Sequence, residues 1–380
     1  MLARLATRTI QDRLDNNPAV ALLGPRQAGK TTLARSLGGT YFDLEQEAER
    51  LRLDLEWDQL VSGRGLVILD EAQAAPEFFP RLRGAIDEDR KRNGRFLLLG
   101  SVSPALMTAV SESLAGRLAL VELTPLLLSE LATEAQRARL WLTGGFPDGG
   151  VLGRGAFPTW QSDYTTLLGQ RDLPTWGMPA RPATTHRLVK MLAALNGRLW
   201  NAAQLGRSLG LSYHTVNSYV DYLVGAFLVR RLPPFHANLK KRLVKSPKVY
   251  WRDTGLLHAL LNVPDERSLL QQPWVGASWE GFVIEQVLGQ LGATGRDYDA
   301  YHLRTSDGRE IDLVLELGGE RWAIEVKLTT SPAADDMRRL DELAGAIRAS
   351  RAYLITRTSR PAGDDRRASA NLPWLLERLG

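Results

Sequence analysis

Short apolar runs separated by helix-like segments dominate the first third of the chain. Residues 19–23 read AVALL, residues 65–69 read GLVIL and residues 95–99 read RFLLL. Runs of this length are typical of strands buried in a parallel sheet. Residues 32–37 have a helix-forming composition and stop at a pair of glycines. The pattern predicts an α/β domain built on a parallel sheet.

The pattern becomes helical in the middle of the chain. An amphipathic helix, a second helix, a tight turn and a third helix are predicted at residues 186–195, 201–209, 210–212 and 213–223. The last three form a helix-turn-helix, with Ser212 placed to cap its second helix. Two short strands then bracket a basic loop, which we interpret as the wing of a winged helix.

The last third predicts a separate α/β domain in the order helix, three strands, helix, strand. The segments are residues 278–291, 298–303, 310–315, 321–328, 333–347 and 352–355. We therefore divide the chain into a first domain, a Gly- and Pro-rich lid or connector, a winged helix and a last domain. Their bounds are residues 1–147, 148–182, 183–262 and 263–380.

Composition narrows the class of protein. Of the 380 residues, 44% are hydrophobic and 24% are charged, which suits a globular chain of two or three domains. The chain has no cysteine and its five histidines are scattered, so we expect no zinc. The N-terminus lacks a secretory apolar core and no apolar run approaches a membrane span, so we expect a cytoplasmic protein. The net charge of +5 is compatible with a polyanionic partner without demanding one.

A phosphate-binding motif directly follows the first predicted strand. Residues 24–31 read GPRQAGKT, which matches G-x-x-x-x-G-K-[ST] between a strand and a helix. In such a loop the backbone N–H groups face phosphate, Lys30 reaches the β- and γ-phosphates, and Thr31 offers its hydroxyl to Mg²⁺. We therefore expect ATP and Mg²⁺ as cofactors. The residues expected to contact ATP are Gly24, Pro25, Arg26, Gln27, Ala28, Gly29, Lys30, Thr31 and Thr32.

Two acids end the second predicted strand. Asp70 and Glu71 lie where open α/β sheets bind ligands, so we expect Asp70 to hold Mg²⁺ through water and Glu71 to polarise the attacking water. Ser101, after the third strand, either senses the γ-phosphate or caps the next helix. Arg117 is either an arginine finger for a neighbouring subunit's ATP or an ordinary surface residue.

In order and spacing, these motifs resemble a prokaryotic family of AAA+-type ATPases whose P-loop domain precedes a largely uncharacterised carboxy-terminal region. The likeness covers nearly the whole chain and rests on residues 24–33, 69–73, 100–103, 115–117 and 144–147. The resemblance implies that Arg117 is the finger and that Ser101 is a sensor. No second sensor arginine stands out, so the route from nucleotide to lid is left open.

The helix-turn-helix and the segment after it offer a candidate nucleic-acid surface. The exposed candidates on the second helix are Tyr213, His214, Asn217 and Ser218. Residues 226–252 contain eight Lys or Arg and no Asp or Glu, and one-sided charge of this kind suits phosphate binding. The basic candidates are Lys240, Lys241, Arg242, Lys245 and Lys248. The alternative is a winged helix that only packs on protein.

The carboxy-terminal strands carry a third constellation. Asp312 lies on one strand, and Glu325 and Lys327 share a face of the next because strand side chains alternate. This arrangement resembles the core of the PD-(D/E)xK nucleases, which have a restriction-endonuclease-like fold. The resemblance implies that Asp312 and Glu325 bind Mg²⁺ and that Lys327 orients water. Glu280 or Glu285 would complete the metal shell, although degenerate relatives serve only as docking platforms.

Two hypotheses for function follow. The preferred one is an oligomeric ATPase that remodels duplex or branched DNA, working as a ring because Arg117 needs a neighbour's active site. The alternative is an ATP-controlled switch that regulates a nuclease or a protein partner, in defence or toxin control, without moving along DNA. A protein-remodelling ATPase is a third possibility for which the sequence shows no substrate-binding feature. No feature indicates a membrane partner.

Overall fold

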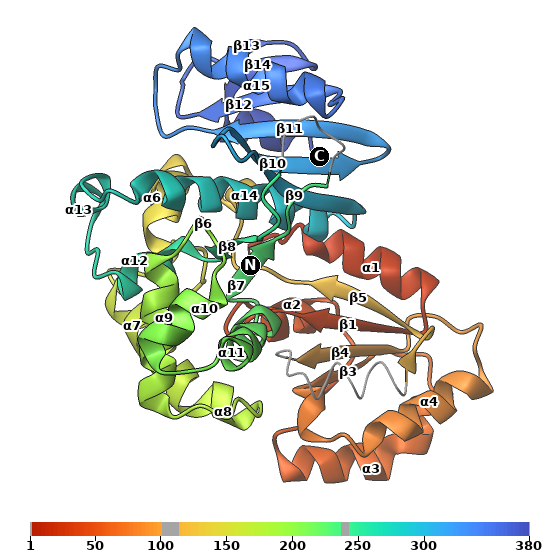
Figure 1. Ribbon diagram of the computed structural model, residues 1–380. Helices are drawn as coiled ribbons and strands as arrows, with labels where there is room; N and C mark the ends of the chain where they lie inside the picture. The colour runs from red at the N-terminus through yellow and green to blue at the C-terminus, as the bar shows by residue number, and fades with distance from the viewer. Residues whose placement is uncertain (1, 101–113, 237–242, 380) are drawn as a thin grey trace.

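The computed structural model describes residues 2–100, 114–236 and 243–379. Within these residues the strands form a five-stranded, a three-stranded and a six-stranded sheet. In Figure 1 the five-stranded sheet lies at the lower right, the helices of the middle region at the left and the C-terminal sheet at the top. Helix α14 (Val275–Ala293) contacts strands of both the first and the last sheet, so it connects the N-terminal and C-terminal parts of the fold by packing.

The first sheet is parallel and confirms the predicted α/β domain. Its strand order is β2-β3-β4-β1-β5, so the strand before the P-loop lies between β4 and β5. The strands are β1 (Ala19–Leu23), β2 (Thr40–Asp43), β3 (Val67–Asp70), β4 (Phe96–Gly100) and β5 (Leu118–Glu122). The flanking helices are α1 (Ala6–Asn16), α2 (Lys30–Ser36), α3 (Glu47–Ser62) and α4 (Phe78–Glu88), with a 3-10 turn η1 (Ala72–Ala74). Because β1 and β3 are parallel, the segments that follow them meet at one edge of the sheet.

The middle region is mostly helical and contains the predicted helix-turn-helix elements. Its helical segments are η2 (Leu128–Glu130), α6 (Glu134–Thr143), α7 (Thr159–Leu167), the π-helical η3 (Leu168–Asp172), α8 (Leu173–Thr175), α9 (Pro182–Ala194), α10 (Ala202–Leu209), α11 (Tyr213–Gly225), α12 (Thr254–Leu260) and α13 (Glu266–Leu270). A small antiparallel sheet of order β6-β8-β7 comprises β6 (Arg198–Leu199), β7 (Val229–Leu232) and β8 (Lys248–Trp251).

Local sequence explains the tight turn between α10 and α11. Gly210 ends α10 with φ +69°, a left-handed conformation that glycine adopts without strain. The side chain of Ser212 then accepts a hydrogen bond from the N–H of Thr215 at 3.1 Å, so Ser212 caps α11 as predicted.

The last sheet is mixed, with strand order β13-β14-β12-β11-β10-β9. Its elements are β9 (Tyr298–Arg304), β10 (Glu310–Leu317), β11 (Glu320–Val326), α15 (Ala334–Ala346), β12 (Arg351–Thr356), β13 (Ala362–Gly363), β14 (Arg367–Asn371) and α16 (Leu372–Glu377). The predicted order helix, three strands, helix, strand is confirmed from α14 to β12. Of the 19 residues of α14, 14 are buried, and they occur on every side of the helix.

The sequence predicts that the connection between β7 and β8 is a wing, and its described part packs on the C-terminal sheet. The N–H of Phe235 donates to the carbonyl of His302 at 2.7 Å, and the N–H of Val244 donates to that of Arg304 at 2.9 Å. The Phe235 side chain is buried in the core beneath β9 and β10. Residues 237–242 lie outside the described part of the chain.

Candidate functional site

The loop between β1 and α2 has the backbone that a phosphate-binding loop needs. A Cβ on Gly24 would lie 2.2 Å from the carbonyl oxygen of Leu123, so only glycine fits at this point. Gly29 has φ +94° and leads directly into α2. The two glycines of the motif are therefore required by close approach in one case and by a left-handed backbone in the other.

Lys30 lies inside this loop. Its Nζ donates to the carbonyl oxygens of Gly24 and Pro25, each at 2.9 Å, and the side chain is buried. Burial lowers the pKa of Lys30 to about 8, while the negative charges of Glu71 and Asp70 act in the opposite direction. The Lys30 ammonium is thus held at the loop by two neutral carbonyl oxygens, which a charged phosphate group can replace.

Asp70 and Thr31 are in direct contact, as the motif predicts. The Thr31 hydroxyl donates to Oδ2 of Asp70 at 2.6 Å, and Oδ1 of Asp70 accepts from the N–H of Glu71 at 2.9 Å. A hydroxyl and a buried carboxylate are ligands, direct or through water, that suit Mg²⁺ at an ATPase site. The donor set at this edge of the sheet therefore fits the expected ion.

Glu71 lies beside this pair in a strained backbone conformation. It has φ +50°, and non-glycine residues held in this region are concentrated at functional sites. Burial raises the pKa of Glu71, and the charge of Lys30 opposes that shift. Gln73 donates a hydrogen bond to Oε2 of Glu71, which orients the carboxylate. A carboxylate with a raised pKa is suited to accept a proton from water.

A cavity of about 980 Å³ opens over the loop and is large enough for a nucleotide. Its polar lining includes Arg4, Arg26, Gln27, Lys30, Thr31, Thr32, Glu71 and Arg171. Its apolar lining includes Leu2, Leu126, Pro147 and Leu152. The cavity thus combines a cationic phosphate end with an apolar wall suited to a base.

Arg26 of the P-loop connects this cavity to the middle region. Its guanidinium lies 2.6 Å from Oδ1 of Asp172 in η3 and 3.7 Å from Oε1 of Glu45. Asp172 is buried, which raises its pKa, and Arg26 acts in the opposite direction. Arg171, next to Asp172, lines the cavity itself. The connector therefore contributes one arginine to the nucleotide cavity and one carboxylate to the loop.

Three residues of this site were not identified from the sequence. The Tyr41 hydroxyl donates to Oδ2 of Asp70 at 2.7 Å from the neighbouring strand β2. Arg4 donates to the carbonyl of Ala28 in the P-loop at 3.0 Å. Arg171 lines the cavity from the connector. Only the adjacent Arg171-Asp172 pair in the connector offered a local signal.

Arg117, the proposed arginine finger, does not line the cavity. Arg117 forms a two-pronged ion pair with Asp87 on α4, at 2.8 and 2.9 Å, which lowers the pKa of Asp87. Within this single chain, Arg117 is therefore held by its own subunit. Ser101 lies outside the described residues.

The candidate nucleic-acid residues of α11 are mostly exposed. Tyr213, His214 and Ser218 face solvent. Asn217 is half-buried, and its Oδ1 accepts a hydrogen bond from Nε1 of Trp200 at 2.8 Å. Three of the four predicted positions are therefore free to meet a partner.

The basic stretch at residues 226–252 is less one-sided than its sequence indicates. Arg230 and Arg252 both pair with Glu285, and Arg231 pairs with Asp221 at 2.6 Å. Lys248 is only 2% exposed and is surrounded by carboxylates, so its prediction as a nucleic-acid contact is wrong. Lys245 is exposed. Lys240, Lys241 and Arg242 lie outside the described residues.

Of the residues predicted for a metal site in the C-terminal domain, all but Glu285 lie in one cluster. Glu325 lies 2.8 Å from Nζ of Lys327, and Oδ2 of Asp312 accepts from the N–H of Val326 at 2.9 Å. Glu280 reaches the same cluster through Lys248. Among the described residues, no group of three or more His, Asp or Glu is arranged to hold a metal ion.

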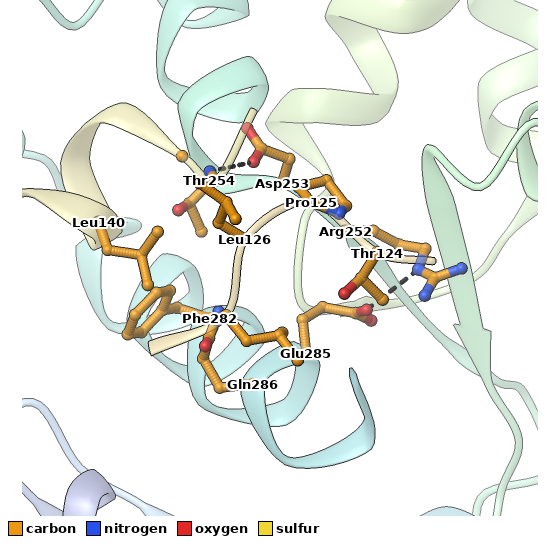
Figure 2. Close-up of a pocket in the computed structure, with 13 residues that line it drawn as sticks. Thr124, Pro125, Leu126, Leu140, Arg252, Asp253, Thr254, Phe282, Glu285 and Gln286 are labelled. Carbon is orange, nitrogen blue, oxygen red and sulfur yellow. Dashed lines mark hydrogen bonds and ion pairs between the residues drawn. The ribbon is translucent and has the colours of Figure 1, made fainter. Parts of the chain in front are cut away.

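Glu285 does not belong to that cluster, so the prediction that Glu285 could complete the metal shell is wrong. It points toward Arg252 in Figure 2, and its Oε2 lies 3.0 Å from Nε of Arg252. Arg230 binds its other oxygen, and the two arginines lower the pKa of Glu285 against the effect of burial. The cavity beside it measures about 30 Å³, which is room for a water molecule only.

The parallel sheet, the loop and the acids at the strand end define a P-loop ATPase, and the AAA domain family matches residues 16–132. Two domains of unknown function, DUF8612 and DUF4143, match residues 134–267 and 275–375. The chain belongs to the same family as the uncharacterized proteins Rv2008c of Mycobacterium tuberculosis and Mb2031c of Mycobacterium bovis. Each is 41% identical over 335 residues, which cover 87% of this chain and 75% of the relative.

Two solved structures show loose overall similarity to the chain. The Walker-type ATPase PABY2304 of Pyrococcus abyssi has a TM-score of 0.47 and 15% identity, covering 67% of this chain and 94% of that one. A DNA replication initiation factor has a TM-score of 0.27 and 13% identity, covering 56% of this chain and 86% of that one. No helix within the described residues is long and apolar enough to cross a membrane.

Proposed function

We propose that this protein is a magnesium-dependent ATPase in which the nucleotide state controls the connector and, through it, the rest of the chain. The observation that carries this proposal is the 2.6 Å ion pair between Arg26 in the P-loop and Asp172 in η3. A phosphate group bound in the loop attracts the Arg26 guanidinium and competes with Asp172 for it. The charge of the bound phosphate therefore affects both the P-loop and the connector.

The hydrolytic roles are divided among four side chains. Lys30 binds the β- and γ-phosphates, and Thr31 together with Asp70 holds Mg²⁺, which neutralises the phosphate charge when it is bound. Tyr41 and the N–H of Glu71 orient Asp70 through their hydrogen bonds. Glu71 orients and deprotonates the attacking water, for which its raised pKa is suited.

Arg171 is the candidate for reading the γ-phosphate within the same subunit. It lines the cavity, and its neighbour Asp172 already contacts the P-loop. A guanidinium on the connector can close toward a bound phosphate and move the connector with it. This arrangement couples hydrolysis to the helices that follow η3.

These contacts favour an ATP-controlled switch that regulates a nuclease or protein partner. The main support for a DNA motor was the basic stretch, and Arg230, Arg231, Lys248 and Arg252 within it are paired with acids of the same chain. The exposed Tyr213, His214 and Ser218 on α11 support DNA contact as a second candidate function. In that case the winged-helix-like region binds duplex or branched DNA and the C-terminal domain, restriction-endonuclease-like in its order of elements, acts as a platform or nuclease.

Subunit assembly and DNA-stimulated hydrolysis separate the two candidates. ATPase rate and sedimentation are measured with and without duplex and four-way DNA. A switch gives a rate that DNA leaves unchanged and no ring in the presence of ATP. A ring that forms with ATP, together with a rate that DNA raises severalfold, would instead establish the motor.

A further inference from the structure

A lysine from the middle region is inserted into the acidic cluster of the C-terminal domain. Nζ of Lys248, on β8, lies 2.8 Å from Oε1 of Glu280, 3.2 Å from Oδ1 of Asp312 and 3.4 Å from Oε2 of Glu310. The lysine is 2% exposed. One ammonium thus contacts three carboxylates that belong to helix α14 and strand β10.

The surrounding hydrogen bonds fix these carboxylates around the ammonium. The Tyr250 hydroxyl, also on β8, donates to the same Oε1 of Glu280. The N–H of Val326 on β11 donates to Oδ2 of Asp312 at 2.9 Å. Burial acts to lower the pKa of Lys248, but the negative charges of the surrounding carboxylates together raise it above its usual value. A buried ammonium with three charged partners is well satisfied, so it does not need solvent or an added ion.

Lys248 cannot easily leave this position, because the chain on both sides of β8 is anchored. Residues that precede it pair with β9 through the N–H of Val244 and through the carbonyl of Ser246, which lies 3.0 Å from Nε2 of His302. After β8, Arg252 binds Glu285 of α14 and Glu122 at the end of β5. The strand that carries the ammonium is therefore clamped between the first and last sheets.

This arrangement does not fit the divalent ion that the nuclease resemblance implies. Mg²⁺ requires oxygen ligands at roughly 2.0–2.1 Å with near-octahedral geometry, and the ammonium occupies the space that Glu280 and Asp312 share. Within the described residues no set of three ligands is arranged for a metal. The cluster nevertheless contains more carboxylates than lysines. Oε2 of Glu325 is buried without a hydrogen-bond partner, and Glu325 lines a cavity of about 220 Å³ together with Glu310 and Lys327.

We propose that Lys248 is an internal cation that occupies the acidic site of the C-terminal domain in place of a divalent metal ion, so that the site accepts a metal only when this ammonium is removed. Glu310 contacts Lys248 and also lines the cavity beside Glu325, so this cavity and the unpartnered oxygen of Glu325 offer space and a further ligand next to the position of the ammonium. The strand β8 thereby keeps the nuclease-like site closed.

Mn²⁺ binding to the full-length protein without nucleotide tests this proposal. Lys248→Met keeps the length of the side chain and removes its charge, and Lys245→Met changes an exposed lysine of the same segment as a control. Thermal unfolding is followed with and without millimolar Mn²⁺. The wild type and Lys245→Met should show no shift. Lys248→Met should unfold at a lower temperature and recover by several degrees with Mn²⁺, because a ligand that binds only the folded state stabilises it.

A second substitution assigns the effect to the cluster. Adding Asp312→Asn to Lys248→Met should abolish the recovery, because it removes a carboxylate that the metal needs. A Lys248→Met protein that Mn²⁺ does not stabilise, whether folded or unfolded at the start, overturns the proposal. Calorimetric titration of the wild type gives an independent check. A Mn²⁺ site there that disappears in Asp312→Asn would mean that Lys248 does not exclude the metal.

Discussion

Arg26 and Asp172 are 146 residues apart in the chain, yet their side chains lie 2.6 Å apart. One belongs to the P-loop and the other to the π-helical segment η3, which lies in the connector. π-Helical turns are rare and often mark functional positions. The pair gives the connector a direct contact with the residues expected to bind phosphate.

Asp172→Asn should uncouple the connector from the nucleotide. The substitution keeps the shape of the side chain and removes the charge that holds Arg26. We expect ATP to bind about tenfold more tightly, since the phosphate no longer competes with Asp172 for Arg26 and charge-assisted pairs contribute roughly 1.5–3 kcal/mol. Hydrogen exchange of residues 159–172 should no longer respond to ATP. Asp163→Asn, at an exposed position of α7, is the control, and a normal response in Asp172→Asn would contradict the coupling.

Tyr41→Phe tests the tyrosine that supports Asp70. The hydroxyl donates to the carboxylate oxygen that also accepts from Thr31, so its loss frees Asp70 to rotate away from the magnesium position. We expect kcat to fall by about three- to tenfold, the usual effect of losing one hydrogen bond of about 1 kcal/mol, with a higher Mg²⁺ requirement. Steady-state kinetics against Mg²⁺ concentration measure both. Unchanged Mg²⁺ dependence would show that Tyr41 only packs beside the site.

ATP binding should become weaker as the pH rises above 8. Burial lowers the pKa of Lys30 to about 8, and a bound phosphate favours the charged ammonium and raises that pKa. ATP binding is therefore coupled to proton uptake in the window above the lower pKa, and affinity decreases as the free protein loses that proton. Titrations between about pH 7.5 and 9.5 in buffers of different ionisation enthalpy measure the uptake. Lys30→Ala should bind ATP very weakly, and a wild-type affinity that does not change over this range would argue against the assigned role.

Arg117 distinguishes a single-subunit ATPase from a ring. Its guanidinium is bound to Asp87 of the same chain, so the switch hypothesis predicts that Arg117→Ala changes the rate by less than about twofold. An arginine finger acting between subunits is worth on the order of 10³–10⁵ in rate. The specific ATPase rate should also be independent of protein concentration. A rate that rises with concentration and collapses in Arg117→Ala would favour the ring.

Much of the ATPase site could be predicted because its residues lie next to recognisable elements. A parallel sheet brings the ends of β1 and β3 together, so the contact between Thr31 and Asp70 follows from two local motifs. Tyr41 could not be found in this way, because its role depends on β2 being the neighbour of β3, and its own sequence context is ordinary.

The distribution of charge along the sequence did not predict the binding role of a residue whose ion-pair partners are distant in the chain. Lys248 resembles a DNA contact beside other basic residues, but the acids that neutralise it lie at positions 280, 310 and 312. Glu280 and Glu285 are five residues apart on one helix, so they point in directions roughly 140° apart. Apolar residues are spread around all of helix α14, so no single polar face indicated which glutamate meets Asp312.

Single-turnover hydrolysis by Glu71→Gln tests the central claim most directly. The substitution keeps the size of the side chain and removes the proton acceptor, so ATP binding should stay within about threefold of the wild type. Hydrolysis should slow by about 10²–10⁴-fold, which is the usual contribution of a general base. Glu77→Gln, at an exposed position nearby, should match the wild type. A Glu71→Gln protein that hydrolyses ATP at the wild-type rate would contradict the ATPase site described for this protein.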